Sequence, residues 1–105
     1  MPGDLIFKED YDGNITRVKV SGEVDIYNSA NLKERLYNII DSRKTDIRID
    51  CSELDYIDST GLGVFAGALK RAKQYGNNIY LYGLKSNIKK LFTITDLDKL
   101  FIIEV

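Results

Sequence analysis

Two apolar periodicities alternate along this chain, and that alternation restricts its fold more than any other feature. Apolar side chains recur at about every second position in residues 15–21 and 46–51, which is typical of strands with one buried face. Each segment is followed by helical spacing of apolar residues, in residues 29–42 and 59–75. Strands that alternate with helices predict a mostly parallel sheet with helices packed against it.

The start of the chain predicts an antiparallel pair within this sheet. Residues 5–9 predict a first strand, and residues 12–14, DGN, are types that accept the positive φ of a tight turn. A hairpin with residues 15–21 is therefore expected. The other expected elements are a strand, a helix capped by Ser86 and a last strand, at residues 79–82, 86–92 and 100–105. We expect one α/β domain over residues 1–105, in the order β-β-α-β-α-β-α-β.

Charged residues within the strands indicate which face of the sheet is exposed. Arg48 and Asp50 alternate with apolar residues, so we expect one face to be partly open to water and the helices to lie mainly on the other. Asn28 or Ser29 is expected to cap the first helix, which should end near residues 41–42.

Two segments do not fit the alternating pattern. Residues 22–25, GEVD, interrupt the second strand's alternation, and residues 52–57 are expected to be a connecting segment that leads to Asp58. The helix after Asp58 should stop near Tyr75, because Gly76 follows it.

Composition excludes several kinds of catalytic and metal site. The 105 residues include no histidine, which excludes Ser-His-Asp and Cys-His catalysis. Cys51 is the single cysteine, so an intrachain disulfide and a structural zinc cage are excluded. The phosphate-binding pattern G-x-x-x-x-G-K-S/T does not occur. An enzyme with Ser59 as nucleophile would have only lysine as its base. We therefore expect no catalytic residue, metal or cofactor.

The charge balance restricts the class of partner. Fifteen basic and sixteen acidic residues give a net charge of −1, which does not indicate nucleic acid or an anionic membrane as partner. No apolar run reaches membrane-spanning length, and the first residues lack the pattern of a signal peptide. We expect a cytoplasmic protein, with a monomer as the default state.

Residues 58–63, DSTGLG, carry the chemistry that stands out. Asp58, Ser59 and Thr60 are types that cap helices, and capping is the simplest interpretation of this run. Gly61 and Gly63 would each cost the helix up to about 1 kcal/mol relative to alanine, so capping does not account for them. They indicate either close access to the backbone or tight packing against a neighbouring element.

A helix start of this kind also fits a phosphorylation site. Free N–H groups and the positive end of the helix dipole would tolerate a phosphate on Ser59 without unwinding the helix. The phosphate would add about −1.5 to −2 charges beside Asp58. Asp25 would add to that negative field if its strand runs beside the third expected strand, residues 46–51.

Three segments together resemble the anti-sigma factor antagonists, bacterial members of the sulfate-transporter and anti-sigma-antagonist (STAS) domain family. Residues 22–25, GEVD, resemble the family's segment at the end of the second strand, and residues 58–65, DSTGLGVF, its phosphorylation segment. Residues 91–95, LFTIT, followed by Leu97, resemble its third-helix segment. One departure is Asp96, which stands where relatives commonly have glycine.

The resemblance implies a phosphorylation-switched regulator. The unphosphorylated protein would bind a serine kinase that is also an anti-sigma factor, and so free the sigma factor. The kinase would use Mg-ATP to phosphorylate Ser59, with Thr60 as the fallback, and a serine phosphatase would reverse the reaction. Asp25, Asp58, Gly61 and Gly63 would flank the site.

The expected partner surface lies on the helix that follows Ser59. Val64, Gly67 and Arg71 fall on one stripe of that helix, away from its apolar face, and are expected to contact the partner. The alternative function is a STAS scaffold or transporter-associated domain that binds its partner without phosphorylation. The acid followed by Ser59 and Thr60 favours the phosphorylated regulator.

Overall fold

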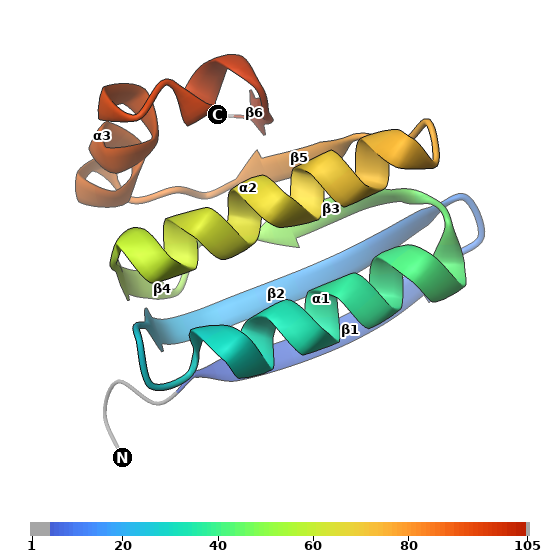
Figure 1. Ribbon diagram of the computed structural model, residues 1–105, viewed down its shortest axis with the longest axis horizontal. Helices are drawn as coiled ribbons and strands as arrows, with labels where there is room; N and C mark the ends of the chain where they lie inside the picture. Colours follow the sequence, from blue (N-terminus) through green and yellow to red (C-terminus); the bar gives the residue numbers. More distant parts are fainter. Residues whose placement is uncertain (1–4, 105) are drawn as a thin grey trace.

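The computed structural model describes residues 5–104 as a sheet with helices over one face (Figure 1). In chain order the elements are β1 (Ile6–Asp12), β2 (Ile15–Val24), α1 (Ser29–Arg43), β3 (Asp46–Asp50), β4 (Leu54–Ile57), α2 (Ser59–Gln74), β5 (Ile79–Tyr82), α3 (Ser86–Ile94), a 3-10 turn (Leu97–Lys99) and β6 (Ile102–Glu104).

The sheet is mixed and mostly parallel, which confirms the prediction from the alternating pattern. Its main strand order is β1-β2-β3-β5-β6, and β4 pairs with β2 off this path. The antiparallel pair is the expected hairpin of β1 and β2, in which Phe7 lies opposite Val20. Every other pairing is parallel.

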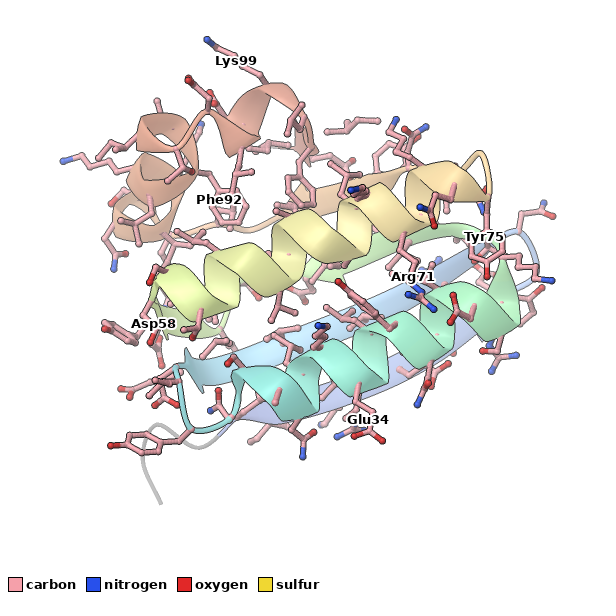
Figure 2. All side chains as sticks on the ribbon, in the orientation of Figure 1. Glu34, Asp58, Arg71, Tyr75, Phe92 and Lys99 are labelled. Carbon is pink, nitrogen blue, oxygen red and sulfur yellow. The ribbon has the colours of Figure 1, made fainter. Side chains whose placement is uncertain are left out.

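The core lies between the sheet and the helices α1 and α2. Strand residues Val18, Ile49 and Leu81 are buried beneath them, while the alternate positions face the partly open side of the sheet. The third helix, α3, joins the same core through Phe92, whose ring lies 5.9 Å from that of Phe65 in α2 (Figure 2). The helices therefore place their apolar faces where their periodicity predicts.

Strand β2 is longer than its sequence pattern indicates. It continues through residues 22–24, which were expected to interrupt it, because that part pairs with β4. The expectation that residues 52–57 form a connecting segment is therefore wrong for residues 54–57. A shift in register between Gly22 and Glu23 breaks the regular alternation of β2 at this point, which explains why residues 22–24 were not predicted as part of β2.

The helix ends differ from the expectations by small amounts. Helix α1 begins at Ser29, but Asn28 does not cap it with its side chain, and the helix continues to Arg43. Helix α2 ends at Gln74, as expected. Ser86 is the first residue of α3 instead of its cap. Asp96, just after α3, has a φ of 61°, a conformation that glycine adopts without strain.

Candidate functional site

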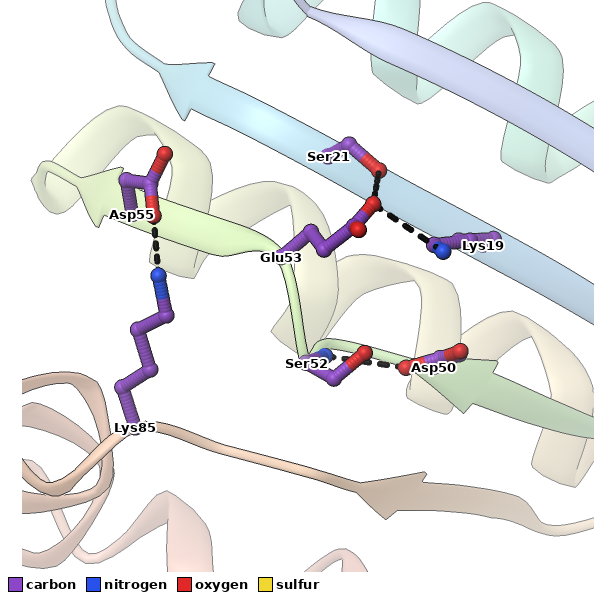
Figure 3. A network of polar contacts seen from close by, with 7 residues as sticks. All are labelled: Lys19, Ser21, Asp50, Ser52, Glu53, Asp55 and Lys85. Atoms are coloured by element: carbon purple, nitrogen blue, oxygen red, sulfur yellow. Dashed lines mark hydrogen bonds and ion pairs between the residues drawn. The ribbon is translucent and has the colours of Figure 1, made fainter.

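The short strand β4 brings the turn at Asp58 to the end of β2. The chain turns between β3 and β4 so that β4 pairs with the end of β2, and Glu53 holds this turn against β2 (Figure 3). Its carboxylate accepts hydrogen bonds from Lys19 at 3.0 Å and Ser21 at 3.3 Å, while its carbonyl accepts one from the Gly22 N–H at 2.9 Å. An ion pair between Lys85 and Asp55 joins β4 to the start of α3. These contacts position the strand that carries the turn.

Asp58 caps helix α2 with its side chain, as the sequence predicts. Its backbone is extended, with a φ of −101°, and its Oδ1 accepts hydrogen bonds from the N–H groups of Thr60 at 2.9 Å and Gly61 at 3.1 Å. The hydrogen bond from the Thr60 hydroxyl lowers the pKa of Asp58 most, and the backbone N–H groups, including that of Ile26, lower it further against the opposing effect of desolvation. Asp58 is therefore a carboxylate at neutral pH.

The two adjacent hydroxyls of the turn have different surroundings. The Thr60 hydroxyl donates a hydrogen bond of 2.5 Å to Asp58 Oδ1 and is half-buried. Ser59 is exposed, and within residues 5–104 its hydroxyl makes no hydrogen bond. Ser59 is thus the hydroxyl that an incoming macromolecule can reach without breaking an interaction of the turn.

The N–H groups at this helix start are less available than expected. We expected free N–H groups to accommodate a phosphate, but those of Thr60 and Gly61 already donate to Asp58. A phosphate on Ser59 would instead lie in solvent, beside the Asp58 carboxylate. The charge would then act on whatever approaches the turn.

The glycines of the turn have two separate roles. A Cβ added to Gly61 would lie 2.6 Å from Ile57 Cγ1 and 2.7 Å from Val24 Cγ1, so this glycine allows α2 to pack closely on β2 and β4. A Cβ on Gly63 would meet nothing within 4 Å, and Gly63 is exposed. Tight packing therefore explains Gly61, and Gly63 leaves the helix surface open to close approach.

Asp25 directly follows β2, and β2 pairs with β3 as the expectation required, but Asp25 lies near Asp58 because of β4, which the sequence did not predict. The last pair of the ladder is Val24 with Ile57, so Asp25 and Asp58 follow at adjacent strand ends. Asp25 also shapes its own loop, since its Oδ1 accepts hydrogen bonds from the N–H groups of Tyr27 at 2.9 Å and Asn28 at 3.3 Å.

This loop presents two apolar side chains that the sequence analysis did not select. Ile26 is 67% exposed and Tyr27 is 94% exposed, in the segment between β2 and α1. Asn28 holds the loop by accepting from the Asp25 N–H at 2.9 Å and donating to the Glu23 carbonyl at 2.8 Å. The useful sequence signal was two large apolar residues in a segment between a strand and a helix.

The stripe of Val64, Gly67 and Arg71 faces helix α1 and not the solvent, which corrects the expected orientation. Val64 is buried, and a Cβ on Gly67 would collide with the hydroxyl of Tyr37 in α1. Arg71 makes two hydrogen bonds of 2.7 Å to Asp41 of α1, between the two helices (Figure 2). The reason is that α1 and α2 lie side by side, which helical periodicity alone does not reveal.

Cys51 and the metal-ligating side chains of the described residues are further candidates for a functional site. Burial raises the pKa of the Cys51 thiol to about 12, so this residue is not a thiolate at neutral pH. Residues 5–104 hold no cluster of three or more metal-ligating side chains. Among the same residues, no helix has both the length and the apolar character needed to cross a membrane.

The fold and the turn together define a small α/β domain that presents a serine hydroxyl at the start of a helix. The STAS domain family model matches residues 9–105. The chain therefore belongs to the STAS domain family, as its sequence motifs imply.

The chain is also similar to individual anti-sigma factor antagonists. It is 40% identical over 83 residues to the anti-sigma-B factor antagonist of Staphylococcus epidermidis, covering 79% of this chain and 77% of the relative. An anti-sigma factor antagonist from Mycobacterium paratuberculosis has the same fold, with a TM-score of 0.80, 22% identity, and coverage of 98% of this chain and 87% of that one. So does the Bacillus cell fate determinant SpoIIAA in its phosphorylated form, with a TM-score of 0.75, 16% identity, and coverage of 95% and 92%.

Proposed function

We propose that this protein is an anti-sigma factor antagonist that is switched by phosphorylation of Ser59. Its unphosphorylated form binds an anti-sigma factor serine kinase, which then releases its sigma factor. The observation that carries the proposal is the exposed Ser59 hydroxyl at an Asp58-capped helix start, in a chain 40% identical to an anti-sigma-B factor antagonist. The protein acts as a monomer in the cytoplasm and is a substrate, not an enzyme.

The chemistry at Ser59 needs little from this chain. The kinase supplies Mg-ATP and the catalytic base, and Ser59 supplies the attacking oxygen. The product carries about −1.5 to −2 additional charges at the turn. Because Asp58 and Asp25 already lie at adjacent strand ends there, the phosphate concentrates negative charge where the kinase docks, and the kinase dissociates. A serine phosphatase removes the phosphate and restores binding.

The partner surface proposed here differs from the stripe of α2 that faces α1. It combines the exposed edge of α2 at Ser59 and Gly63 with the loop residues Ile26 and Tyr27. The bare backbone at Gly63 admits close approach, and the two apolar side chains supply area that loses water on binding. Aromatic residues such as Tyr27 are enriched among the residues that dominate binding energy.

The test is incubation with purified anti-sigma factor kinase of the same organism and Mg-ATP, followed by intact-mass and peptide mapping. We expect one phosphate on Ser59, and none on the Ser59→Ala variant. A wild-type protein that gains no phosphate but still binds the kinase would favour the alternative, a STAS scaffold or transporter-associated domain that binds without modification. Phosphate on Thr60 in place of Ser59 would correct the site.

A further inference from the structure

The two hydroxyls of the turn differ in exposure and in hydrogen bonding. Both come from one segment, at neighbouring positions of the first turn of α2, and a kinase that reaches one approaches the other. Ser59 is exposed, whereas the Thr60 hydroxyl donates a 2.5 Å hydrogen bond to Asp58 Oδ1. Such short bonds are typical when a hydroxyl donates to a charged carboxylate, and they are stronger than bonds between neutral groups.

The acceptor of this bond is itself fixed in place. The same oxygen of Asp58 accepts from the backbone N–H groups of Thr60 and Gly61, at 2.9 and 3.1 Å. The Asp58 N–H donates to the Val24 carbonyl at 3.1 Å, which attaches the residue to the end of the sheet. Asp58 therefore cannot follow Thr60 if that side chain turns outward, and the hydroxyl must give up its bond to react.

Phosphoryl transfer requires the acceptor hydroxyl to pass its proton to the kinase, and the hydrogen bond to Asp58 opposes this movement for Thr60. The acceptor oxygen must direct a lone pair at the γ-phosphorus of ATP and pass its proton to the base of the kinase. The new O–P bond forms as the bond between the γ-phosphorus and its bridging oxygen breaks, and ADP leaves. In the folded turn the Thr60 proton is directed at Asp58, and the β-branched side chain has few χ1 rotamers to choose from. The Ser59 side chain is not β-branched, and its hydroxyl is not bonded to Asp58.

We propose that Asp58 determines which hydroxyl is phosphorylated, by holding the Thr60 hydroxyl and leaving Ser59 as the acceptor. This inference rests on the proposed function of the turn. It makes Asp58 a positioning residue that acts through Thr60, in addition to its role as helix cap. A purely capping Asp58 would affect stability and leave the choice of acceptor unchanged.

The substitution Asp58→Asn separates these two roles. Asparagine caps helices about as well as aspartate, so the turn keeps its backbone contacts. The neutral amide oxygen holds the Thr60 hydroxyl less strongly than a carboxylate does. Asp25→Asn is the matched control, because it removes the neighbouring negative charge without touching Thr60.

The experiment measures phosphate on Thr60 in chains that lack the Ser59 hydroxyl. With kinase and Mg-ATP, we expect Ser59→Ala and Ser59→Ala/Asp25→Asn to remain nearly unmodified. Ser59→Ala/Asp58→Asn should gain phosphothreonine at Thr60 at a rate about tenfold higher, the factor expected when the hydrogen bond to be broken goes to a neutral group and not to a charged one. Equal rates in the three variants, with a phosphorylated wild type, would overturn the inference.

A second readout needs no kinase. In wild type, the Thr60 hydroxyl proton should exchange slowly enough to give its own proton NMR resonance, which Asp58→Asn should weaken or abolish. If wild type shows this resonance but is not phosphorylated, the proposed function is contradicted, while the hydrogen bond between Thr60 and Asp58 is still supported. A resonance that is absent in wild type, or unchanged in Asp58→Asn, would contradict the proposal that the Asp58 carboxylate holds the Thr60 hydroxyl.

Discussion

The backbone N–H of Asp58 donates a hydrogen bond of 3.1 Å to the carbonyl of Val24. This bond follows directly on the last ladder pair of β2 and β4, so the turn begins where the sheet ends. The cap of α2 is thereby attached to the core, while Ser59, one residue later, is exposed. Changes at the surface of the turn should therefore alter binding and leave the fold intact.

Gly61→Ala should destabilise the protein by about 1–3 kcal/mol, the usual cost of overpacking a core. The added methyl group would meet Val24 and Ile57 at distances below 3 Å. Urea unfolding followed by circular dichroism measures this change. An unchanged midpoint would show that α2 can move away from the sheet at no cost.

Gly63→Ala is the matched control in the same turn, and we expect the opposite result. Its methyl group would meet nothing within 4 Å, so stability should rise by up to about 1 kcal/mol through the higher helix propensity of alanine. Kinase binding should weaken, because the added methyl group lies on the proposed docking surface. Full binding by Gly63→Ala would remove this residue from the surface.

Tyr27→Ala and Ile26→Ala should each weaken kinase binding by about tenfold or more, since exposed apolar and aromatic anchors contribute strongly to interfaces. Both side chains are exposed, so the thermal midpoint should hardly change. Tyr11→Ala is a suitable control: Tyr11 is 45% exposed but lies in the β1–β2 hairpin, at the other end of the molecule. Isothermal titration calorimetry would measure the three affinities, and equal losses in all three would contradict the proposed surface.

Protonation of Asp58 should remove part of the stability of the protein in acid. Its pKa in the folded state lies below the ordinary value of 3.8, mainly because the Thr60 hydroxyl donates to it. A lowered pKa contributes stability at pH values above 3.8, and this contribution is lost as pH falls through the folded-state pKa. The stability advantage of wild type over Asp58→Asn should therefore shrink in acid. Urea unfolding of wild type and Asp58→Asn, from neutral pH to below pH 3.8, measures the difference in their free energies of unfolding. A difference that does not change with pH would argue against the hydrogen bond from Thr60 to Asp58.

Asp96→Gly should raise the free energy of unfolding by a few tenths to about 1 kcal/mol, because glycine adopts a positive φ without strain. Asp96 has a φ of 61°, in the left-handed region that favours glycine. Thr95→Gly is the control, since Thr95 has a φ of −91° and gains nothing from glycine. A loss of stability in Asp96→Gly would show that its side chain contributes more than its backbone costs.

Much of the fold could be predicted from the sequence because its elements carry clear periodicities. The hairpin followed from residues 12–14, and helix α2 followed from apolar spacing that ends before Gly76. The Asp58 cap was predictable from residue type. The residue types at positions 58–63 indicated the turn, and the resemblance to a family, carried by three motifs in order, favoured Ser59 over Thr60 as the phosphorylated residue.

The features that could not be predicted from the sequence depend on contacts between elements or between side chains. Strand β4 was missed because its buried residues, Leu54 and Ile57, are three positions apart and not two. The burial of Val64 follows from the side-by-side packing of α1 and α2, which neither helix encodes alone. The difference between Ser59 and Thr60 rests on one side-chain hydrogen bond, which residue types do not predict.

The most direct test of the central claim is the affinity of one kinase preparation for the protein before and after phosphorylation of Ser59. We expect the phosphorylated form to bind at least about a hundredfold more weakly, because like charges brought together at an interface cost several kcal/mol. Its far-ultraviolet circular dichroism should match that of the unmodified protein. Equal affinities for the two forms would contradict the account.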